Sequence, residues 1–223
     1  MSSRAGAANA LNVVMLGPPG AGKGTQAERL SRVRSLPKIS TGDILREAGQ
    51  AGTEMGLAAK KTMDAGNLVS DDVMIGIVQD RLDREDARHG FVLDGFPRTV
   101  VQATALDRMV DGRGPLVVLD MVVPEDVLVR RLAGRRICSK CGANAAPEWT
   151  NACGKCGGPL VMRVDDGADI VRERLKVYQR QTKPLVDYYS ARPTFRAIDG
   201  NQAPDVVTAA VDDALEAARG AAL

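Results

Sequence analysis

Aromatic residues are scarce in this chain of 223 residues, since Phe, Trp and Tyr together make up 3% of it. A surface that binds single-stranded nucleic acid by base stacking needs such side chains, so this class of protein is disfavoured. The formal net charge of +2 also argues against a general nucleic-acid or membrane binder. The hydrophobic content of 44% supports a folded core, which must be built mainly from Ala, Val, Leu and Ile.

Long apolar runs are missing as well. No stretch of 18 apolar residues is present, so the sequence predicts no transmembrane helix. The first apolar stretch, residues 13–16, is too short for the apolar region of a signal peptide. We therefore expect a cytoplasmic protein that binds neither membranes nor nucleic acid, with a flexible tail over residues 1–10. Nothing in the pattern suggests a coiled coil, and we expect a monomer.

Two further absences narrow the chemistry. The single histidine, His89, precedes a predicted strand and is interpreted as a surface loop residue rather than a catalyst. A base-reading Asn-Lys-x-Asp motif is absent, which argues against a regulatory GTPase. A mechanism that uses a histidine base is therefore not expected.

Short apolar segments alternate with helical patterns, which predicts a parallel sheet with helices on both faces. The expected strands are residues 11–16, a short one at Ile39, 91–94, 116–123 and 195–199. The expected helices are 23–33, 43–51, 54–65, one capped by Ser70 or Asp71, 124–133, 169–189 and 203–218. A stretch rich in Gly, Ala, Asn and Cys, residues 142–159, interrupts the alternation and is interpreted as part of an insertion.

The most informative motif is GPPGAGKGT at residues 17–25, which follows a predicted strand and opens a predicted helix. Glycines allow backbone N–H groups to crowd around phosphate oxygens, and the start of a helix adds partial positive charge. Lys23 can reach the outer phosphates of a nucleoside triphosphate. The residues expected to bind the phosphates of this nucleotide are Gly17, Gly20, Ala21, Gly22, Lys23, Gly24 and Thr25.

The phosphate loop, the segment KISTGDILR, and FVLDGFPRT with Gln102 downstream together resemble the adenylate kinase family. The resemblance continues through RLAGRR, four cysteines and VRERL, and covers about residues 11–200. It implies a P-loop NTPase-like α/β fold, with a parallel five-stranded sheet flanked by helices and a small inserted zinc lid. It also implies Mg²⁺-dependent phosphoryl transfer from ATP to AMP, which gives two ADP. Another nucleoside monophosphate as acceptor is the nearest alternative.

The resemblance also implies a division of the chain. The core domain would comprise residues 11–39, 70–133 and 167–223. Residues 40–69 would form a mobile AMP-binding segment, and residues 134–166 would form the lid. Both segments are expected to close over their ligands, because water would otherwise accept the phosphoryl group.

The AMP site implied by the resemblance draws on both sides of the sheet. Arg46 and Arg98 can grip a phosphate with paired hydrogen bonds, and Gln102 offers the donor and acceptor that an adenine edge demands. Asp94 ends a strand at the carboxyl edge of the sheet and is expected to hold Mg²⁺ through water. The implied AMP-binding residues are Thr41, Arg46, Val69, Gly95, Arg98, Gln102, Arg163 and Arg172.

On the ATP side, the resemblance adds Arg131 and Arg135 to the phosphate loop. Because they are four residues apart, these two arginines are expected to share one helix face. Asp165 and Asp166 are either surface acids or partners of arginines in the lid. The implied catalytic set is Lys23, Arg98, Arg135, Arg163 and Arg172, which would position the phosphates and neutralise charge while the AMP phosphate attacks in line.

Four cysteines lie in one short window as two C-x-x-C pairs, Cys138 with Cys141 and Cys153 with Cys156. This spacing is typical of a four-thiolate structural zinc site, which would fold a segment too small for its own core. Two disulfides, an iron–sulfur centre and free thiols are the alternatives. We expect one Zn²⁺ per chain, with Trp149 either packed on the cysteine loops or in contact with the donor nucleotide.

Overall fold

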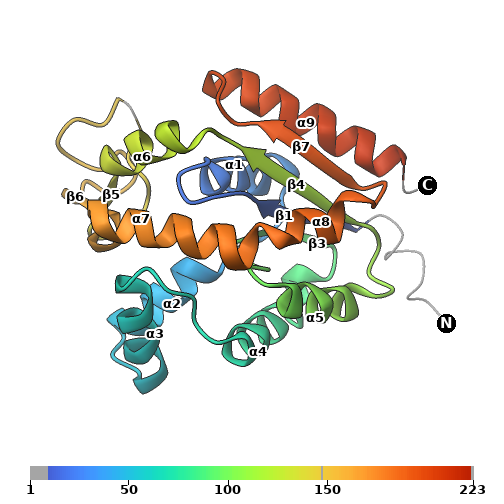
Figure 1. Cartoon of the computed structure of the whole chain (residues 1–223), viewed down its shortest axis with the longest axis horizontal. Coiled ribbons are helices and arrows are strands. Elements are labelled where there is room, and N and C mark those ends of the chain that lie inside the picture. The colour runs from blue at the N-terminus through green and yellow to red at the C-terminus, as the bar shows by residue number, and fades with distance from the viewer. Residues whose placement is uncertain (1–9, 147, 222–223) are drawn as a thin grey trace.

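The computed structural model describes residues 10–146 and 148–221 and has an α/β architecture (Figure 1). Its centre is a five-stranded, wholly parallel sheet with the strand order β2-β3-β1-β4-β7. The predicted fold class is confirmed. The strands are β1 (Leu11–Leu16), β2 (Lys38–Ser40), β3 (Gly90–Asp94), β4 (Leu116–Val122) and β7 (Phe195–Asp199).

β1 lies at the middle of this sheet, between β3 and β4, and all six of its residues are buried. The register pairs Val13 with Val92 on one side and with Val117 on the other. A strand that is covered on both faces needs an apolar side chain at nearly every position, which explains the continuous apolar runs in the sequence. The phosphate loop therefore follows directly on a buried strand at the centre of the sheet.

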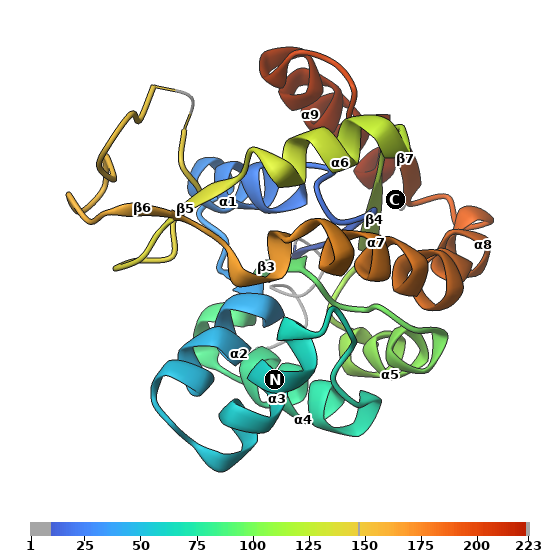
Figure 2. The ribbon, with the colours of Figure 1, turned by 60° about the vertical axis from the view of Figure 1, so that its left-hand side comes forward.

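Helices cover both faces of the sheet (Figure 2). One face packs against α1, α6, α7 and α9, and the other against α2, α3, α4, α5 and α8. Among the described residues, no helix is both long and apolar enough to cross a membrane. The helices are α1 (Lys23–Arg34), α2 (Thr41–Gln50), α3 (Glu54–Asp64), α4 (Asp71–Leu82), α5 (Val100–Val110), α6 (Glu125–Ala133), α7 (Ala168–Val177), α8 (Pro184–Ser190) and α9 (Pro204–Gly220).

The long helix predicted for residues 169–189 is wrong in its middle. α7 ends at Val177, a π-helical turn covers Tyr178–Thr182, and α8 begins at Pro184. Pro184 has no N–H to donate and its ring clashes with the carbonyl four residues earlier, so regular α-helical bonding cannot continue. At this point the chain uses a π-helical hydrogen bond, which spans five residues instead of four: the N–H of Lys183 donates to the carbonyl of Tyr178 at 2.9 Å.

Three smaller expectations also need correction. α5 was not predicted, although Thr99 caps it by accepting a hydrogen bond from the N–H of Gln102. Ser70 occupies the N-cap position of α4, as expected, but its side chain makes no hydrogen bond to the first turn. Of the predicted flexible tail, residues 1–9 lie outside the described part of the chain, and Ala10 is buried, which does not fit a flexible tail.

The inserted segment projects from the core between α6 and α7 (Figure 2). An antiparallel pair of strands, β5 (Arg136–Cys138) and β6 (Leu160–Met162), forms its base. Sequence periodicity missed this pair because three residues are too few to show an alternation. The hairpin carries the four cysteines outward and ends at the 3₁₀ turn Val164–Asp166, which leads into α7.

Candidate active site

The phosphate loop connects the carboxyl end of β1 to α1, as the motif predicts. Gly17 has a φ of +129°, and a Cβ there would lie 2.6 Å from the carbonyl oxygen of Met121 on the neighbouring strand. Gly20 and Gly22 also have positive φ values, 85° and 94°, which other residues adopt only with strain. Glycine is therefore required at these three positions to bring the backbone around a phosphate.

Lys23 is the first residue of α1, and its ammonium folds back over the loop. It donates to the carbonyls of Gly17 and Pro18, both at 2.8 Å. Burial lowers the pKa of Lys23 to about 8, although the charge of Asp94 opposes this shift. Arg98, Arg135 and a further arginine, Arg174, lower the pKa as well, so the lysine belongs to a crowded cationic site.

Asp94 reaches the phosphate loop from the end of β3. A Cβ added to Gly24 would lie 3.1 Å from Oδ2 of Asp94, which explains why glycine follows the lysine here. Thr25 is the next residue of α1 after Gly24 and is exposed. The Asp94 carboxylate supplies the hard oxygen donor that Mg²⁺ prefers, directly or through water.

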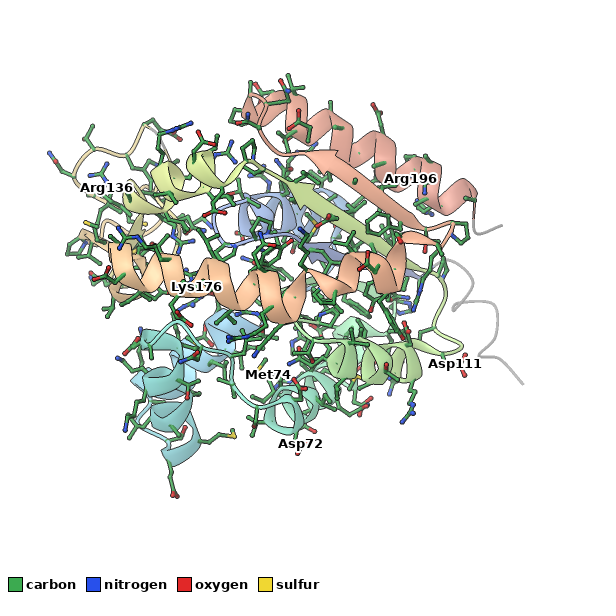
Figure 3. The ribbon with its side chains drawn as sticks, in the orientation of Figure 1. Asp72, Met74, Asp111, Arg136, Lys176 and Arg196 are labelled. Carbon is green, nitrogen blue, oxygen red and sulfur yellow. The ribbon has the colours of Figure 1, made fainter. Side chains whose placement is uncertain are left out.

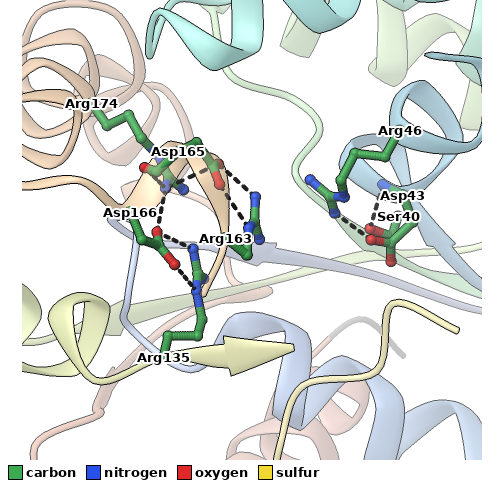
Figure 4. Close-up of polar contacts among 8 residues, drawn as sticks. All are labelled: Ser40, Asp43, Arg46, Arg135, Arg163, Asp165, Asp166 and Arg174. Carbon is green, nitrogen blue, oxygen red and sulfur yellow. Dashed lines mark hydrogen bonds and ion pairs between the residues drawn. The ribbon is translucent and has the colours of Figure 1, made fainter. Parts of the chain in front are cut away.

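A cluster of arginines and aspartates lies where the inserted hairpin joins α7 (Figure 4). Asp166, whose side chain is fully buried, accepts two hydrogen bonds from Arg135 at 2.6 and 2.7 Å and one from Arg174 at 3.0 Å. Asp165 accepts two from Arg163, at 2.6 and 2.8 Å, and pairs with Arg174 at 3.1 Å. Three cations and two anions leave one net positive charge. Paired bonds fix the orientation of the Arg135 and Arg163 guanidinium groups, while Arg174 contacts both carboxylates through one nitrogen.

One arginine expected in the site lies elsewhere. Arg172 is exposed and donates to the equally exposed Asp169 on its own helix, so the structure does not bring it to the cluster. Arg174, two residues later, occupies that place. Arg131 donates to the carbonyl of Gly200 at 2.9 Å from the last turn of α6, whereas Arg135 follows the end of that helix. The expectation that these two share a helix face is therefore wrong.

The acceptor side of the site is built around the loop after β3. The carbonyl of Gly95 accepts from Nε of Arg98 at 2.8 Å and from Oγ1 of Thr41 at 2.9 Å. Gly95 has a φ of +87°, and a Cβ there would lie 2.9 Å from the Thr41 hydroxyl. Burial lowers the pKa of Arg98, and the nearby Arg46 and Arg163 lower it further, while Asp94 raises it.

A pocket opens beside this loop, and it combines apolar and polar walls. Val69, Gln102 and Arg98 were expected there, and the pocket lies between the start of α2, the end of α3 and α4. Its lining residues are Thr41, Leu45, Met63, Asn67, Leu68, Val69, Met74, Arg98 and Gln102. Arg46 lies on α2 and donates to Asp43, whose N–H in turn donates to the capping Ser40 (Figure 4). The arrangement suits a flat apolar base with an anionic group attached.

The four cysteine sulfurs converge within the inserted hairpin. All lie within 4.8 Å of one another, with 3.5 Å between Cys138 and Cys156 and 3.6 Å between Cys141 and Cys153. A tetrahedral Zn²⁺ with bonds of 2.3 Å spaces its sulfurs about 3.8 Å apart, so the four thiols fit one such ion. The N–H groups of residues 140 and 141 donate to the sulfur of Cys138, which favours a thiolate there.

A buried acid near the phosphate loop was not predicted. Asp120 is on β4, directly opposite Leu16 in the register, and is 6% exposed. One of its carboxylate oxygens has no hydrogen-bond partner among the described residues. Burial raises the pKa of Asp120, and the charge of Lys23 offsets part of this effect. The acid lies in an otherwise apolar strand, which is the signal that could have identified it.

Comparisons with known proteins agree with this geometry. A protein-family model described as Adenylate kinase matches residues 15–194. A curated adenylate kinase of Archaeoglobus fulgidus is 48% identical over 213 residues, covering 92% of this chain and 98% of its own. Those of Methanosarcina acetivorans and Caldicellulosiruptor bescii are 49% and 50% identical, covering 88% and 82% of this chain and 94% and 88% of their own.

Proposed function

The chain belongs to the adenylate kinase family, and from that premise we propose how its own residues perform the reaction. The reaction transfers a phosphoryl group from ATP to AMP and gives two ADP. The observation that carries our proposal is the convergence of Lys23, Arg98 and the cluster of Arg135, Arg163 and Arg174 at the carboxyl edge of the sheet. These cations surround the point where two nucleotides would meet end to end.

On the donor side, the phosphate loop binds ATP with its backbone N–H groups and the start of α1. Lys23 exchanges its bonds to the carbonyls of Gly17 and Pro18 for phosphate oxygens. Arg131 borders the donor nucleotide beside Gly200, and Arg135 reaches the transferred phosphate. The role that the sequence suggested for Arg172 passes to Arg174 in this proposal, since Arg174 is the one that contacts the cluster.

On the acceptor side, AMP occupies the pocket between α2, α3 and α4. Arg98 and Arg46 bind its phosphate, while Gln102 contacts the base. Thr41 and Gly95 hold Arg98 in place, and Val69 packs on the ring. Arg163 lies close enough to Arg98 to lower its pKa, so the lid can add a cation to the acceptor phosphate.

Catalysis then needs no base. An oxygen of the AMP phosphate attacks the γ-phosphorus in line, while the bond from that phosphorus to the β,γ-bridging oxygen breaks and ADP leaves. The fixed cations stabilise the charge on the group in transfer. Mg²⁺ accompanies ATP in this family and neutralises phosphate charge when bound, and Asp94 would hold it through water. Asp165 and Asp166 keep the arginines oriented before a phosphate arrives, which lowers the cost of reorganisation.

The lid metal is proposed to be one structural Zn²⁺. The four sulfurs lie close enough together to share one tetrahedral ion, which would have no position open for a reacting water, so the ion would support folding rather than chemistry. An iron–sulfur cluster requires thiolates spread around several metal atoms, which this tight group does not offer. Trp149 packs within the second cysteine loop, because a Cβ on Gly154 would lie 2.5 Å from its indole nitrogen.

A panel of acceptors tests this function directly. The protein is incubated with Mg²⁺-ATP and each nucleoside monophosphate in turn, and the diphosphates are separated by chromatography. We expect rapid ADP formation with AMP and slow turnover with the other monophosphates. Equal or faster turnover with another monophosphate would overturn the adenine assignment, and no diphosphate with any acceptor would overturn the kinase. The monomeric state and cytoplasmic location stay predictions.

A further inference from the structure

The side-chain amide of Gln102 is held from two sides. Its Oε1 accepts from the backbone N–H of Arg98 at 2.8 Å, and its Nε2 donates to Oδ1 of Asp71 at 2.8 Å. Gln102 is 1% exposed and lines the acceptor pocket. The N–H of Arg98 belongs to the loop after β3, and Asp71 belongs to the first turn of α4, so both partners have fixed positions.

These two partners permit a single orientation of the amide. A carboxylate only accepts hydrogen bonds and a backbone N–H only donates them. If the amide of Gln102 rotated by half a turn, its oxygen would face the carboxylate of Asp71 and its NH₂ group would face the N–H of Arg98. Two attractive contacts would become two repulsive ones, so the pairing selects against the rotated state.

Among the residues that the structure describes, the held amide keeps one N–H and one oxygen lone pair without a partner. Adenine presents a matching edge, in which N1 accepts and the 6-amino group donates. Hypoxanthine and guanine present the reverse, because N1 carries a proton and the oxygen at position 6 accepts. We infer that Asp71 is a specificity-determining residue, which fixes the polarity of Gln102 so that the acceptor site takes a 6-amino purine and rejects a 6-oxo purine.

Asp71 is well held for this task. The same Oδ1 that accepts from Gln102 also accepts from the hydroxyl of Thr99 at 3.0 Å. Thr99 caps α5 and Asp71 opens α4, so the carboxylate joins the starts of two helices. The carboxylate cannot turn away from Gln102 without also losing the Thr99 bond. This inference rests on the proposed contact between Gln102 and the acceptor base.

The experiment compares kcat and KM for AMP and for IMP at saturating Mg²⁺-ATP. IMP differs from AMP only at position 6 and the N1 proton, so it isolates the polarity of the base edge. The variants are Asp71→Asn, whose amide can either accept from or donate to Gln102, Asp71→Ala, which can do neither, and Gln102→Ala. Asp72→Asn is the matched control, because Asp72 also lies in the first turn of α4 but is exposed and points outward (Figure 3).

Asp71→Asn should lower the AMP-to-IMP ratio of kcat/KM by about tenfold, the size expected for redirecting one hydrogen bond. Part of that change should be an absolute gain with IMP. Asp71→Ala should weaken AMP without a gain for IMP, and Asp72→Asn should match the wild type. The KM for ATP and the kcat for AMP should stay within about twofold in the Asp71 variants.

A gain with IMP is a result that a merely structural role for Asp71 would not produce. If Gln102→Ala lowers the ratio while Asp71→Asn leaves it unchanged, the inference about Asp71 is wrong and the proposed acceptor site stands. If Gln102→Ala also leaves the ratio unchanged, both the inference and the assignment of Gln102 are wrong. If Asp71→Asn folds poorly, Asp71→Ala decides the question. The inference predicts a lower AMP-to-IMP ratio with an unchanged KM for ATP, whereas an unchanged ratio, with both monophosphates weakened alike, would overturn it.

Discussion

Arg174 donates to the fully buried carboxylate of Asp166 at 3.0 Å, while Arg172, on the same helix, extends into solvent. Val171, Leu175 and Val177 form the buried side of α7. A helix turns by about 100° per residue, so Arg174, three residues before Val177, lies on the same face as Val177, whereas Arg172, five residues before it, points away. The two arginines therefore form a natural pair for comparison.

Replacing Arg174 by Ala should lower kcat by about 10²–10³-fold, because a preorganised cation would be lost from the transferring phosphate. Arg172→Ala should change kcat by less than about twofold, as expected for an exposed ion pair. Steady-state kinetics at saturating ATP and AMP measures both, with thermal melting to confirm folding. Equal losses in the two variants would contradict the assignment of Arg174.

The binding of ATP should weaken at alkaline pH. Lys23 has a pKa of about 8 in the free protein, and a bound phosphate stabilises the charged form and raises this value. Below pH 8 the ammonium is already present, so Kd changes little. Above pH 8 binding must also protonate the amine, and Kd should rise by up to about tenfold per pH unit. Calorimetric titration between pH 7 and 9.5 measures this.

The control for the pH dependence is Lys23→Met, which should bind ATP weakly, give no measurable phosphoryl transfer and keep the native fold. Its Kd should be nearly constant over the same pH range. A wild-type Kd that stays constant to pH 9.5 would show that Lys23 keeps its proton in the free protein. This result would contradict the lowering of its pKa by burial.

Asp120 is predicted to reduce stability at neutral pH. Burial raises its folded-state pKa above the value in the unfolded chain. Well below both values the acid is neutral in both states and costs nothing, and as pH rises through the folded pKa the protein must keep a buried charge. Asp120→Asn should therefore raise Tm at pH 7.5, where each 1 kcal/mol corresponds to about 2–4 °C.

The gain from Asp120→Asn should shrink as the pH approaches 4, because the wild-type carboxyl is then protonated too. Scanning calorimetry of both proteins at several pH values gives the comparison. Asp126→Asn on the exposed first turn of α6 is a control that should not raise Tm at neutral pH, since its carboxylate pairs with Arg130. A lower Tm for Asp120→Asn at pH 7.5 would mean that the native charge is stabilising.

Removing the lid metal should lower Tm. We expect about one Zn²⁺ per chain by elemental analysis, and we expect chelation or Cys138→Ser to release it and melt the hairpin. Ser139→Ala, in the same loop and exposed, should keep the metal. Protein that contains no metal and melts identically with and without chelator would rule out a structural zinc.

Local signals in the sequence predicted the parts of the site that are local in the chain. Residues 17–25 carry the phosphate loop by themselves, because strand, glycines, lysine and helix are contiguous. The two C-x-x-C pairs identify a metal site in the same way. Such motifs need no knowledge of how distant segments meet.

The rest depends on contacts between segments far apart in sequence. Asp71 and Gln102 are 31 residues apart, and the start of α4 indicates only a helix beginning. Choosing Arg174 over Arg172 required the contact of Arg174 with Asp166 and the burial of Val177, which lies beyond the motif VRERL. The π-helical turn follows from Pro184. The prediction of one long helix rested on periodicity and did not take this proline into account.

The central claim is that the arginines on both sides of the cleft hold one phosphate chain. Its most direct test is a crystal structure with two adenosines joined through their 5′ oxygens by five phosphates. We predict that Lys23, Arg135 and Arg174 will lie within hydrogen-bond distance of the donor phosphates, with Arg46 and Arg98 on the acceptor phosphate. A complex in which Arg46 and Arg98 turn away from the second nucleotide would contradict the account.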